Sequence, residues 1–200
     1  MTSKRSYTGH TVAARRDERR QRLIEAATRL YARLGYRNAG VRAVCQDAGL
    51  TERYFYESFA NGEALLLAAF DAAVVDLIGQ IRAVADPGLP ASERSRLMLR
   101  AYYGAMRDQP DAARLFLVEI SGVSPTVDRA FARSLTDLSE LILDTHDPDR
   151  VGPVAADPLL RRGVAGGLLH IALAWLESGF DRPLDAVVEA AAPLCLLARP

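Results

Sequence analysis

The sequence contains little cysteine, and its two cysteines lie far apart. Cys45 and Cys195 each occupy an apolar segment with helical spacing, unlike the dense disulfide framework of a small secreted domain. No apolar run reaches the roughly 20 residues that a membrane span needs. The first residues, MTSKR, lack the apolar core of a signal peptide. We therefore expect a soluble cytoplasmic protein with no membrane partner.

The signature motifs of common enzyme classes are also absent. The chain has no Glu-x-x-His pair of a di-iron bundle, no Walker-type phosphate loop, no Gly-x-Ser-x-Gly and no Cys-x-x-Cys. Asp144, His146, Asp147 and Asp149 are residue types that bind metals, but they lack a known ligand spacing, and we interpret them as part of a solvated loop. We therefore expect no enzyme activity, no cofactor and no metal.

The net charge is zero over the whole chain, but the two signs are distributed unevenly. Residues 1–60 hold 12 Lys and Arg against 6 Asp and Glu, whereas residues 61–200 hold 13 against 19. A basic first third followed by an acidic remainder is typical of a chain that meets a polyanion at one end. A solvated basic helix would give the same imbalance, so charge alone leaves both interpretations open.

Apolar residues recur with the spacing of amphipathic helices along nearly the whole chain, and no segment shows the sustained alternation of a strand. Asp86-Pro87-Gly88-Leu89-Pro90 and the Asp- and Pro-rich stretch 147–158 are clear breaks. We therefore predict an all-α fold of about nine helices. The expected ranges are about 15–34, 41–48, 52–58, 61–84, 92–108, 111–121, 125–145, 157–178 and 184–198.

The stretch 40–65 has the layout of a helix-turn-helix. Two short helical segments are joined by Ala-Gly-Leu-Thr at 48–51, where Gly49 suits the tight turn. Val44, Cys45, Leu50 and Phe55 are expected to form a small core with the preceding helix. This leaves the polar face of residues 52–58 exposed, as a helix that reads a DNA major groove requires.

The same stretch, together with the helix before it, resembles the tetracycline-repressor (TetR) family. The resemblance covers residues 20–67 and includes LYARLGY at 30–36, VRAVCQDAGLT at 41–51 and YFYESFANGEALL at 54–66. It implies a three-helix DNA-binding domain over residues 1–60 and a helical ligand-binding and dimerisation domain over residues 61–200. It also implies that the last two helices form a homodimer.

Three residues are expected to contact the DNA backbone. Arg42 lies near the start of its helix, Thr51 can cap the next helix and present its hydroxyl, and Tyr56 matches a phosphate-contacting tyrosine of the family. The family often has Thr where Gly40 stands and Lys where Gly62 stands, and both of these contact phosphate. A basic N-terminal arm is expected to compensate for their loss by tracking phosphates or entering a minor groove. Its residues are Lys4, Arg5, Arg15, Arg16, Arg19 and Arg20.

Base edges are expected to be read by the helix over residues 52–58. Arg53 is the candidate for a bidentate contact to guanine, and Glu52 and Tyr54 are weaker candidates. Surface packing is the alternative role for Tyr54 and Tyr56. For Glu52 the alternative is a favourable interaction of its first-turn charge with the helix dipole.

The C-terminal part is expected to hold an effector and a second subunit. The resemblance implies a pocket enclosed by the fifth to seventh helices, where apolar residues with few polar groups are expected. Segment 163–176 is apolar on most faces and rich in small residues, so we expect it to pack against its copy, with Ala172 inside the interface. Ordinary core packing is the alternative for each pocket residue, and a satisfied interface histidine is the alternative for His170. The candidate ligand contacts are Tyr102, Tyr103, Met106, Phe116, Glu119 and Trp175.

These features predict a ligand-responsive transcriptional repressor. Its expected partners are a near-palindromic double-stranded DNA operator, a second copy of the chain, and a small apolar or amphipathic effector that releases the DNA. The loss of Thr and Lys at positions 40 and 62 supports an alternative. In that alternative, the chain is a helical ligand-binding or partner-binding protein with weakened sequence-specific DNA binding.

Overall fold

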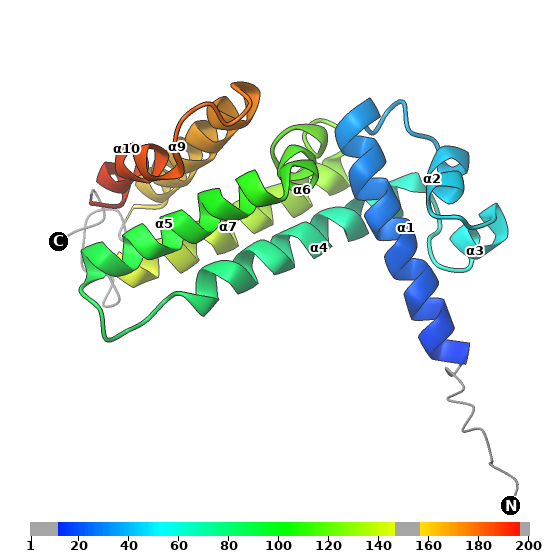
Figure 1. The fold of residues 1–200 in the computed structure, drawn as a ribbon, viewed down its shortest axis with the longest axis horizontal. Coiled ribbons are helices and arrows are strands. Elements are labelled where there is room, and N and C mark those ends of the chain that lie inside the picture. Colours follow the sequence, from blue (N-terminus) through cyan, green and yellow to red (C-terminus); the bar gives the residue numbers. More distant parts are fainter. Residues whose placement is uncertain (1–11, 147–156, 197–200) are drawn as a thin grey trace, which may run out of the picture.

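A computed structural model describes residues 12–146 and 157–196, and over these ranges the chain is all-helical, as predicted (Figure 1). Helices α1 (Val12–Leu34), α2 (Val41–Asp47) and α3 (Glu52–Tyr56) form the N-terminal end. The remainder consists of α4 (Gly62–Ala83), α5 (Ala91–Asp108), α6 (Pro110–Arg114), the π-helix η1 (Leu115–Glu119), α7 (Pro125–His146), α9 (Pro158–Glu177) and α10 (Leu184–Leu196).

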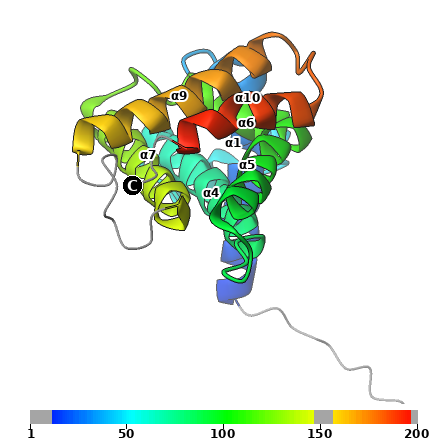
Figure 2. The ribbon, with the colours of Figure 1, turned by 90° about the vertical axis from the view of Figure 1, so that its left-hand side faces the viewer.

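Three long helices, α4, α5 and α7, run side by side away from the N-terminal end, and α9 and α10 lie across them (Figures 1 and 2). One continuous apolar core extends from Leu23 in α1 to Cys195 in α10. Helix α4 packs against α1 at one end and against α5 and α7 along its length. It therefore connects the N-terminal end with the rest of the molecule.

The segment predicted as one helix over 111–121 is instead divided into α6 and η1. Pro110 opens α6 in the first turn, where its missing N–H removes no intrahelical bond. Leu115, Phe116 and Leu117 are consecutive and all buried. In a regular α-helix they would point about 100° apart. The segment is buried on several sides, against α1, α4 and α9, and the wider π turn distributes these side chains among those neighbours.

Two helices are more apolar than the sequence analysis expected, although their bounds lie close to the predicted ones. By length and composition alone, α4 and α9 could each cross a membrane. The apolar residues of α4 build the core, since Leu65, Leu66 and Phe70 are fully buried. Helix α9 buries a smaller share of its residues than α4 does. Its exposed side includes Leu159, whose exposed fraction is 74%.

Ala172 does not lie on that exposed side. Its exposed fraction is 1%, and it packs in the core of its own subunit together with Leu168 and Trp175. The residues of α9 that face away from the core include Gly163, His170 and Ala174. The sequence pattern placed the apolar helix correctly but not its orientation, because α9 is apolar on most sides.

Candidate nucleic-acid interface and effector cavity

The helix-turn-helix is fixed to α1 by its tight turn. Gly49 has φ of +63°, a left-handed conformation that favours glycine. The Arg22 guanidinium donates a hydrogen bond of 2.6 Å to the carbonyl of Ala48. Val44, Cys45 and Phe55 are buried beneath the turn, as predicted, whereas Leu50 is only half-buried and packs against the same core. The turn therefore has a defined position relative to α1, and α3 projects from it.

The six predicted DNA contacts lie in α2, in α3 or at the start of α3. Arg42 is exposed in the first turn of α2. Thr51 is the N-cap residue of α3, but its side chain makes no capping hydrogen bond and is exposed. In α3, Glu52 and Arg53 are exposed, and Tyr56 is 60% exposed although its ring touches Phe55 edge-on.

Tyr54 and Arg53 both contact other residues of the protein. The guanidinium of Arg19 lies over the Tyr54 ring, 4.5 Å from its centroid, and Tyr54 is only half-exposed. Arg53 donates a 3.1 Å hydrogen bond to Glu57, one helical turn further on, while its side chain remains 85% exposed. An exposed ion pair of this kind contributes about 0–1 kcal/mol, so a stronger partner such as a base edge can replace it.

Three arginines of the expected phosphate-tracking arm contact the C-terminal end of α3 or the residues just after it. Arg16 donates a 2.8 Å hydrogen bond to the carbonyl of Glu57, and Arg19 lies 3.8 Å from the Glu57 carboxylate. Arg20 lies over the Phe59 ring at 5.0 Å. Arg15 is exposed. Lys4 and Arg5 lie outside the described residues.

The two glycines that depart from the family pattern both leave space for a side chain. Gly40 is the N-cap of α2, with φ of −70°, and a Cβ added there would meet no heavy atom within 4 Å. At Gly62, in the first turn of α4, an added Cβ would lie 3.7 Å from the Tyr36 hydroxyl, an ordinary contact. Neither glycine is required by backbone conformation or by packing.

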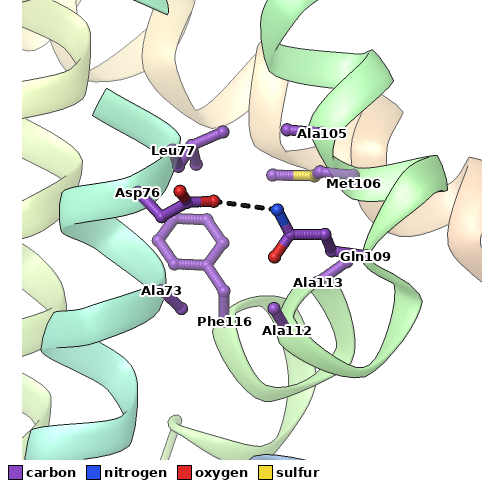
Figure 3. A pocket seen from close by; sticks show the side chains of 9 residues that line it. All are labelled: Ala73, Asp76, Leu77, Ala105, Met106, Gln109, Ala112, Ala113 and Phe116. Atoms are coloured by element: carbon purple, nitrogen blue, oxygen red, sulfur yellow. Dashed lines mark hydrogen bonds between the residues drawn. The ribbon is translucent and has the colours of Figure 1, made fainter. Parts of the chain in front are cut away.

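A small cavity lies between α4, α5, α6 and η1 (Figure 3). Its volume is about 20 Å³, roughly the room for one water molecule. Two of the predicted ligand contacts, Met106 and Phe116, line it. The Gln109 side-chain amide donates a 2.8 Å hydrogen bond to Asp76 at its polar edge. Sequence reasoning missed Asp76, although a carboxylate within the apolar sequence of α4 was an available signal.

Two other predicted ligand contacts, Tyr103 and Trp175, lie where α5 meets α9, and a third, Tyr102, is buried with its ring against Tyr103. Tyr102 and Tyr103 are buried, and burial raises the pKa of both phenols. The Tyr103 hydroxyl donates a 3.1 Å hydrogen bond to the carbonyl of Leu168 in α9. The Trp175 indole donates a 3.0 Å hydrogen bond to the carbonyl of Arg182. None of the three lines the cavity of Figure 3.

Glu119 lies at the contact between η1 and the end of α1. Its carboxylate accepts a 3.0 Å hydrogen bond from the backbone N–H of Tyr36 and lies 3.8 Å from Arg114. Gly35, with φ of +82°, passes close to the same carboxylate, and a Cβ added there would lie 3.4 Å from it. The main partner of this half-buried carboxylate is therefore a backbone amide at the N-terminal end of the molecule.

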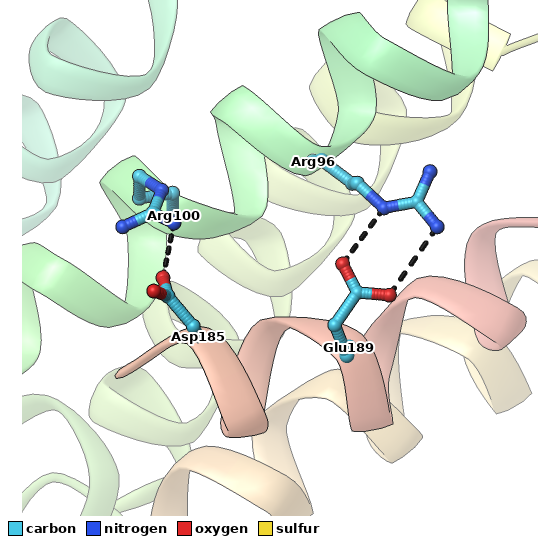
Figure 4. A network of polar contacts seen from close by, with 4 residues as sticks. All are labelled: Arg96, Arg100, Asp185 and Glu189. Atoms are coloured by element: carbon cyan, nitrogen blue, oxygen red, sulfur yellow. Dashed lines mark hydrogen bonds and ion pairs between the residues drawn. The ribbon is translucent and has the colours of Figure 1, made fainter. Parts of the chain in front are cut away.

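An exposed network holds α10 against α5 (Figure 4). Arg96 donates two hydrogen bonds to Glu189, of 2.9 and 3.3 Å, and Arg100 pairs with Asp185. Hydrogen bonding to Arg96 lowers the pKa of Glu189. Both ion pairs link residues more than 80 positions apart in sequence.

No metal site is present among the described residues, where no group of three or more His, Cys, Asp or Glu side chains is placed to hold an ion. The side chains of Asp144, His146, Asp147 and Asp149 lie outside the description. The site described above consists of the exposed polar helix α3 on a helix-turn-helix. Helices α4 and η1 join this end to the helical body. These features define a helix-turn-helix DNA-binding regulator.

Comparison with known proteins identifies the family. The model of the bacterial regulatory proteins of the tetR family matches residues 23–69, from within α1 into α4. The transcriptional repressor KstR of Rhodococcus jostii is 30% identical over 159 residues, covering 74% of this chain and 72% of KstR. The transcriptional activator FasR of Mycolicibacterium smegmatis is 23% identical over 170 residues, covering 85% of this chain and 77% of FasR. The chain belongs to the TetR family of transcriptional regulators.

Solved structures share the fold over most of the chain. The fatty acid degradation regulator FadR of Bacillus halodurans has a TM-score of 0.78 at 19% identity, covering 89% of this chain and 94% of FadR. FadR of Bacillus subtilis, solved in complex with stearoyl-CoA, has a TM-score of 0.76 at 18% identity, covering 88% and 96%. The helical body beyond residue 69 therefore has structural counterparts where the family model ends.

Proposed function

We propose that this regulator is a repressor that binds a near-palindromic operator as a homodimer, through α3, and leaves the DNA when an amphipathic effector binds. The observation that carries the proposal is the exposed polar face of α3, held by arginines of α1 and by buried Phe55. Residues 1–60 act as the DNA-binding domain and residues 61–200 as the effector and dimer domain. Such a protein works inside the cytoplasm and needs no catalytic step.

The dimer surface in this proposal is the uncovered side of α9. Leu159, Gly163 and Ala174 form an exposed stripe of apolar and small residues along the helix, and the polar side chain of His170 lies between them. Small side chains allow two helices to approach closely, and a two-fold contact would present two copies of α3 to one DNA face. In a helical regulator, an exposed apolar helix face is best explained by contact with a second copy of the chain.

The effector in this proposal enters the body near Met106 and Phe116. The cavity there is too small for an effector, and the rings of Phe70, Phe116 and Phe131 pack together beside it. Phe116 and Phe70 are stacked at 5.7 Å, so an apolar chain can enter only if these rings move. The stearoyl-CoA of the Bacillus subtilis neighbour is such an amphipathic molecule, and we propose an effector of the same kind.

DNA binding in this proposal is tested by a gel shift against the DNA next to the protein's own gene. Arg53→Ala should cost about 1–3 kcal/mol at one base position and relax preference there, because a bidentate base contact is lost. Arg42→Ala should weaken binding to all sequences equally and reduce the salt dependence, because a phosphate contact is lost. If Arg53→Ala lowered the affinity for every DNA sequence equally, Arg53 would contact only phosphate.

A second function remains supported by specific residues. With glycine at positions 40 and 62, two phosphate contacts are missing, and Arg53 is paired with Glu57. These features favour a helical ligand-binding or partner-binding protein with weakened sequence-specific DNA recognition. The absence of any shifted band at low salt, with the effector still bound, would favour this second function.

A further inference from the structure

A groove between α7 and α9 is distinct from the small cavity beside Phe116. It lies where α9 crosses α7 (Figure 2) and has a volume of about 610 Å³, within the range of small-molecule sites. The two helices supply all of its lining. The lining residues are Arg129, Ala132, Arg133, Leu135, Thr136, Ser139, Arg162, Ala165 and Gly166.

The charge of this groove is unlike that of the domain around it. Residues 61–200 contain more acidic than basic residues, yet the groove is lined by three arginines and no carboxylate. Elsewhere in the domain Arg96, Arg100, Arg107 and Arg114 each lie within 4 Å of a carboxylate. Among the described side chains no carboxylate lies within ion-pair distance of these arginines, so three guanidinium groups in one concave site create a local positive potential.

Two of the groove arginines have free hydrogen-bonding capacity. Among the side chains that the structure describes, no carboxylate lies within ion-pair distance of Arg133 or Arg162. Arg129 donates one hydrogen bond, of 3.2 Å, to the Thr126 hydroxyl. Burial raises the pKa of Asp71 in α4, and Arg133 partly offsets that rise without forming an ion pair.

The remaining lining residues suit the start of an apolar chain. Ala132, Leu135 and Ala165 are apolar, and Gly166 leaves open space, since an added Cβ would meet no heavy atom within 4 Å. The hydroxyls of Thr136 and Ser139 donate to backbone carbonyls of α7, so their oxygens are available only as acceptors or weak contacts. Arginine is the side chain best matched to phosphate, because its planar fork donates two parallel hydrogen bonds.

We propose that the groove lined by Arg129, Arg133 and Arg162 binds the phosphate-bearing head of an amphipathic effector. This proposal rests on the proposed function, because it assigns the head of the same effector whose apolar tail enters the body. The groove thereby selects a phosphorylated conjugate, such as an acyl thioester of coenzyme A, over the corresponding free fatty acid.

The test is isothermal titration calorimetry on the full chain without DNA, using stearoyl-CoA, coenzyme A and stearate as separate probes. The triple variant Arg129→Ala, Arg133→Ala, Arg162→Ala should bind stearoyl-CoA at least tenfold more weakly than the parent. Coenzyme A should bind the parent less tightly than stearoyl-CoA and show the same dependence on the three arginines. Arg107→Ala, an exposed arginine of the same domain outside the groove, should leave affinity unchanged.

Arg133→Lys separates charge from geometry. Lysine keeps the charge but lacks the bidentate fork, so this variant should lose only part of the affinity that Arg133→Ala loses. Circular dichroism and sedimentation should show that all variants keep the fold and assembly of the parent.

Equal affinity of the parent and the triple variant for stearoyl-CoA would overturn the proposal, as would an arginine-dependent preference for stearate or no binding of either phosphate-bearing probe. Failure of the proposed function is recognised separately. If the chain shifts no DNA but binds stearoyl-CoA through these arginines, the proposed DNA-binding function is contradicted and the proposed phosphate site is supported.

Discussion

Arg53 is the residue with the clearest expected base contact, yet in the free protein its guanidinium is paired with Glu57. Glu57 also lies 3.8 Å from Arg19, and its carbonyl accepts a hydrogen bond from Arg16. This one residue therefore holds α3 against α1 and orients Arg53 along the exposed face. A guanine base must displace Glu57 to bind Arg53. The free energy lost with this exposed ion pair is small compared with that of a bidentate guanine contact.

Buried ionisable residues predict how stability depends on pH. Burial raises the pKa of Cys195 to about 12, and it also raises the pKa of Cys45, Tyr102 and Tyr103. A raised folded-state pKa gives a contribution that is complete below the unfolded pKa and is lost as pH rises through the folded pKa. With unfolded thiols near 8.5, the free energy of unfolding should fall from about pH 8.5 towards pH 12.

The measurement is urea unfolding followed by circular dichroism between pH 7 and pH 11. In the Cys45→Ala, Cys195→Ala double variant the decline should begin nearer pH 10, because only the tyrosines then contribute. A decline that starts at the same pH in both proteins would show that the thiols titrate normally in the folded state.

At the scale of an element, the first turns of α2 and α4 predict a gain of DNA affinity. Gly40→Thr places a capping residue at the start of α2, and Gly62→Lys places a cation at the start of α4. Both positions have room for a side chain. Each variant should bind operator and non-operator DNA more tightly, and Gly62→Lys should steepen the dependence of log K on log salt by roughly 0.9.

Fluorescence anisotropy with labelled operator, measured at several salt concentrations, checks this prediction. Gly79→Lys, an exposed position near the C-terminal end of α4, provides a matched control with the same added charge. Equal gains from Gly62→Lys and Gly79→Lys would show that the charge acts only at long range.

The π-helix η1 links the effector region to the DNA-binding end. Phe116 lines the cavity, and Glu119 accepts the backbone N–H of Tyr36 next to α1. Movement of Phe116 on effector binding would therefore be transmitted to α1 by η1, in addition to any tilt of α4.

Loss of the Glu119 carboxylate should weaken this link. Glu119→Ala leaves the Tyr36 N–H without its acceptor and should destabilise the protein by about 1–3 kcal/mol in urea unfolding. Glu119→Gln keeps an acceptor oxygen and should recover most of that loss. The effector should also lower operator affinity less in Glu119→Ala than in Glu119→Gln. The role of Glu119 would be refuted if the two variants had equal stability and equal response.

At the scale of the whole molecule, the exposed stripe of α9 predicts the assembly. Ala174→Glu places a charge on this stripe and should give monomers in sedimentation velocity, because an unpaired charge would be buried between subunits. Val75→Glu makes a comparable change on the exposed side of α4 and should leave the dimer intact. An unchanged dimer in Ala174→Glu would place the interface elsewhere on the molecule.

The sequence by itself determined the helix-turn-helix and most of the helices, but not the division of the segment after Gln109 into α6 and η1. Apolar spacing, the turn at Gly49 and the burial of Phe55 are local properties, so each could be inferred from a few neighbouring residues. The charge imbalance between residues 1–60 and 61–200 is also a property of the sequence alone. The roles in DNA binding assigned to Arg42, Thr51, Glu52, Arg53, Tyr54 and Tyr56 remain predictions.

Only the tertiary structure decided which distant residues meet. None of Tyr102, Tyr103 and Trp175 lines the cavity beside Phe116. Tyr103 meets Leu168 and Trp175 of α9 instead, and Ala172 is turned into the core. Glu119 reaches Tyr36 across 83 positions of sequence, and the groove arginines come from two separate helices. Helical periodicity defines the faces of one helix, but the packing of all the helices determines which face is covered.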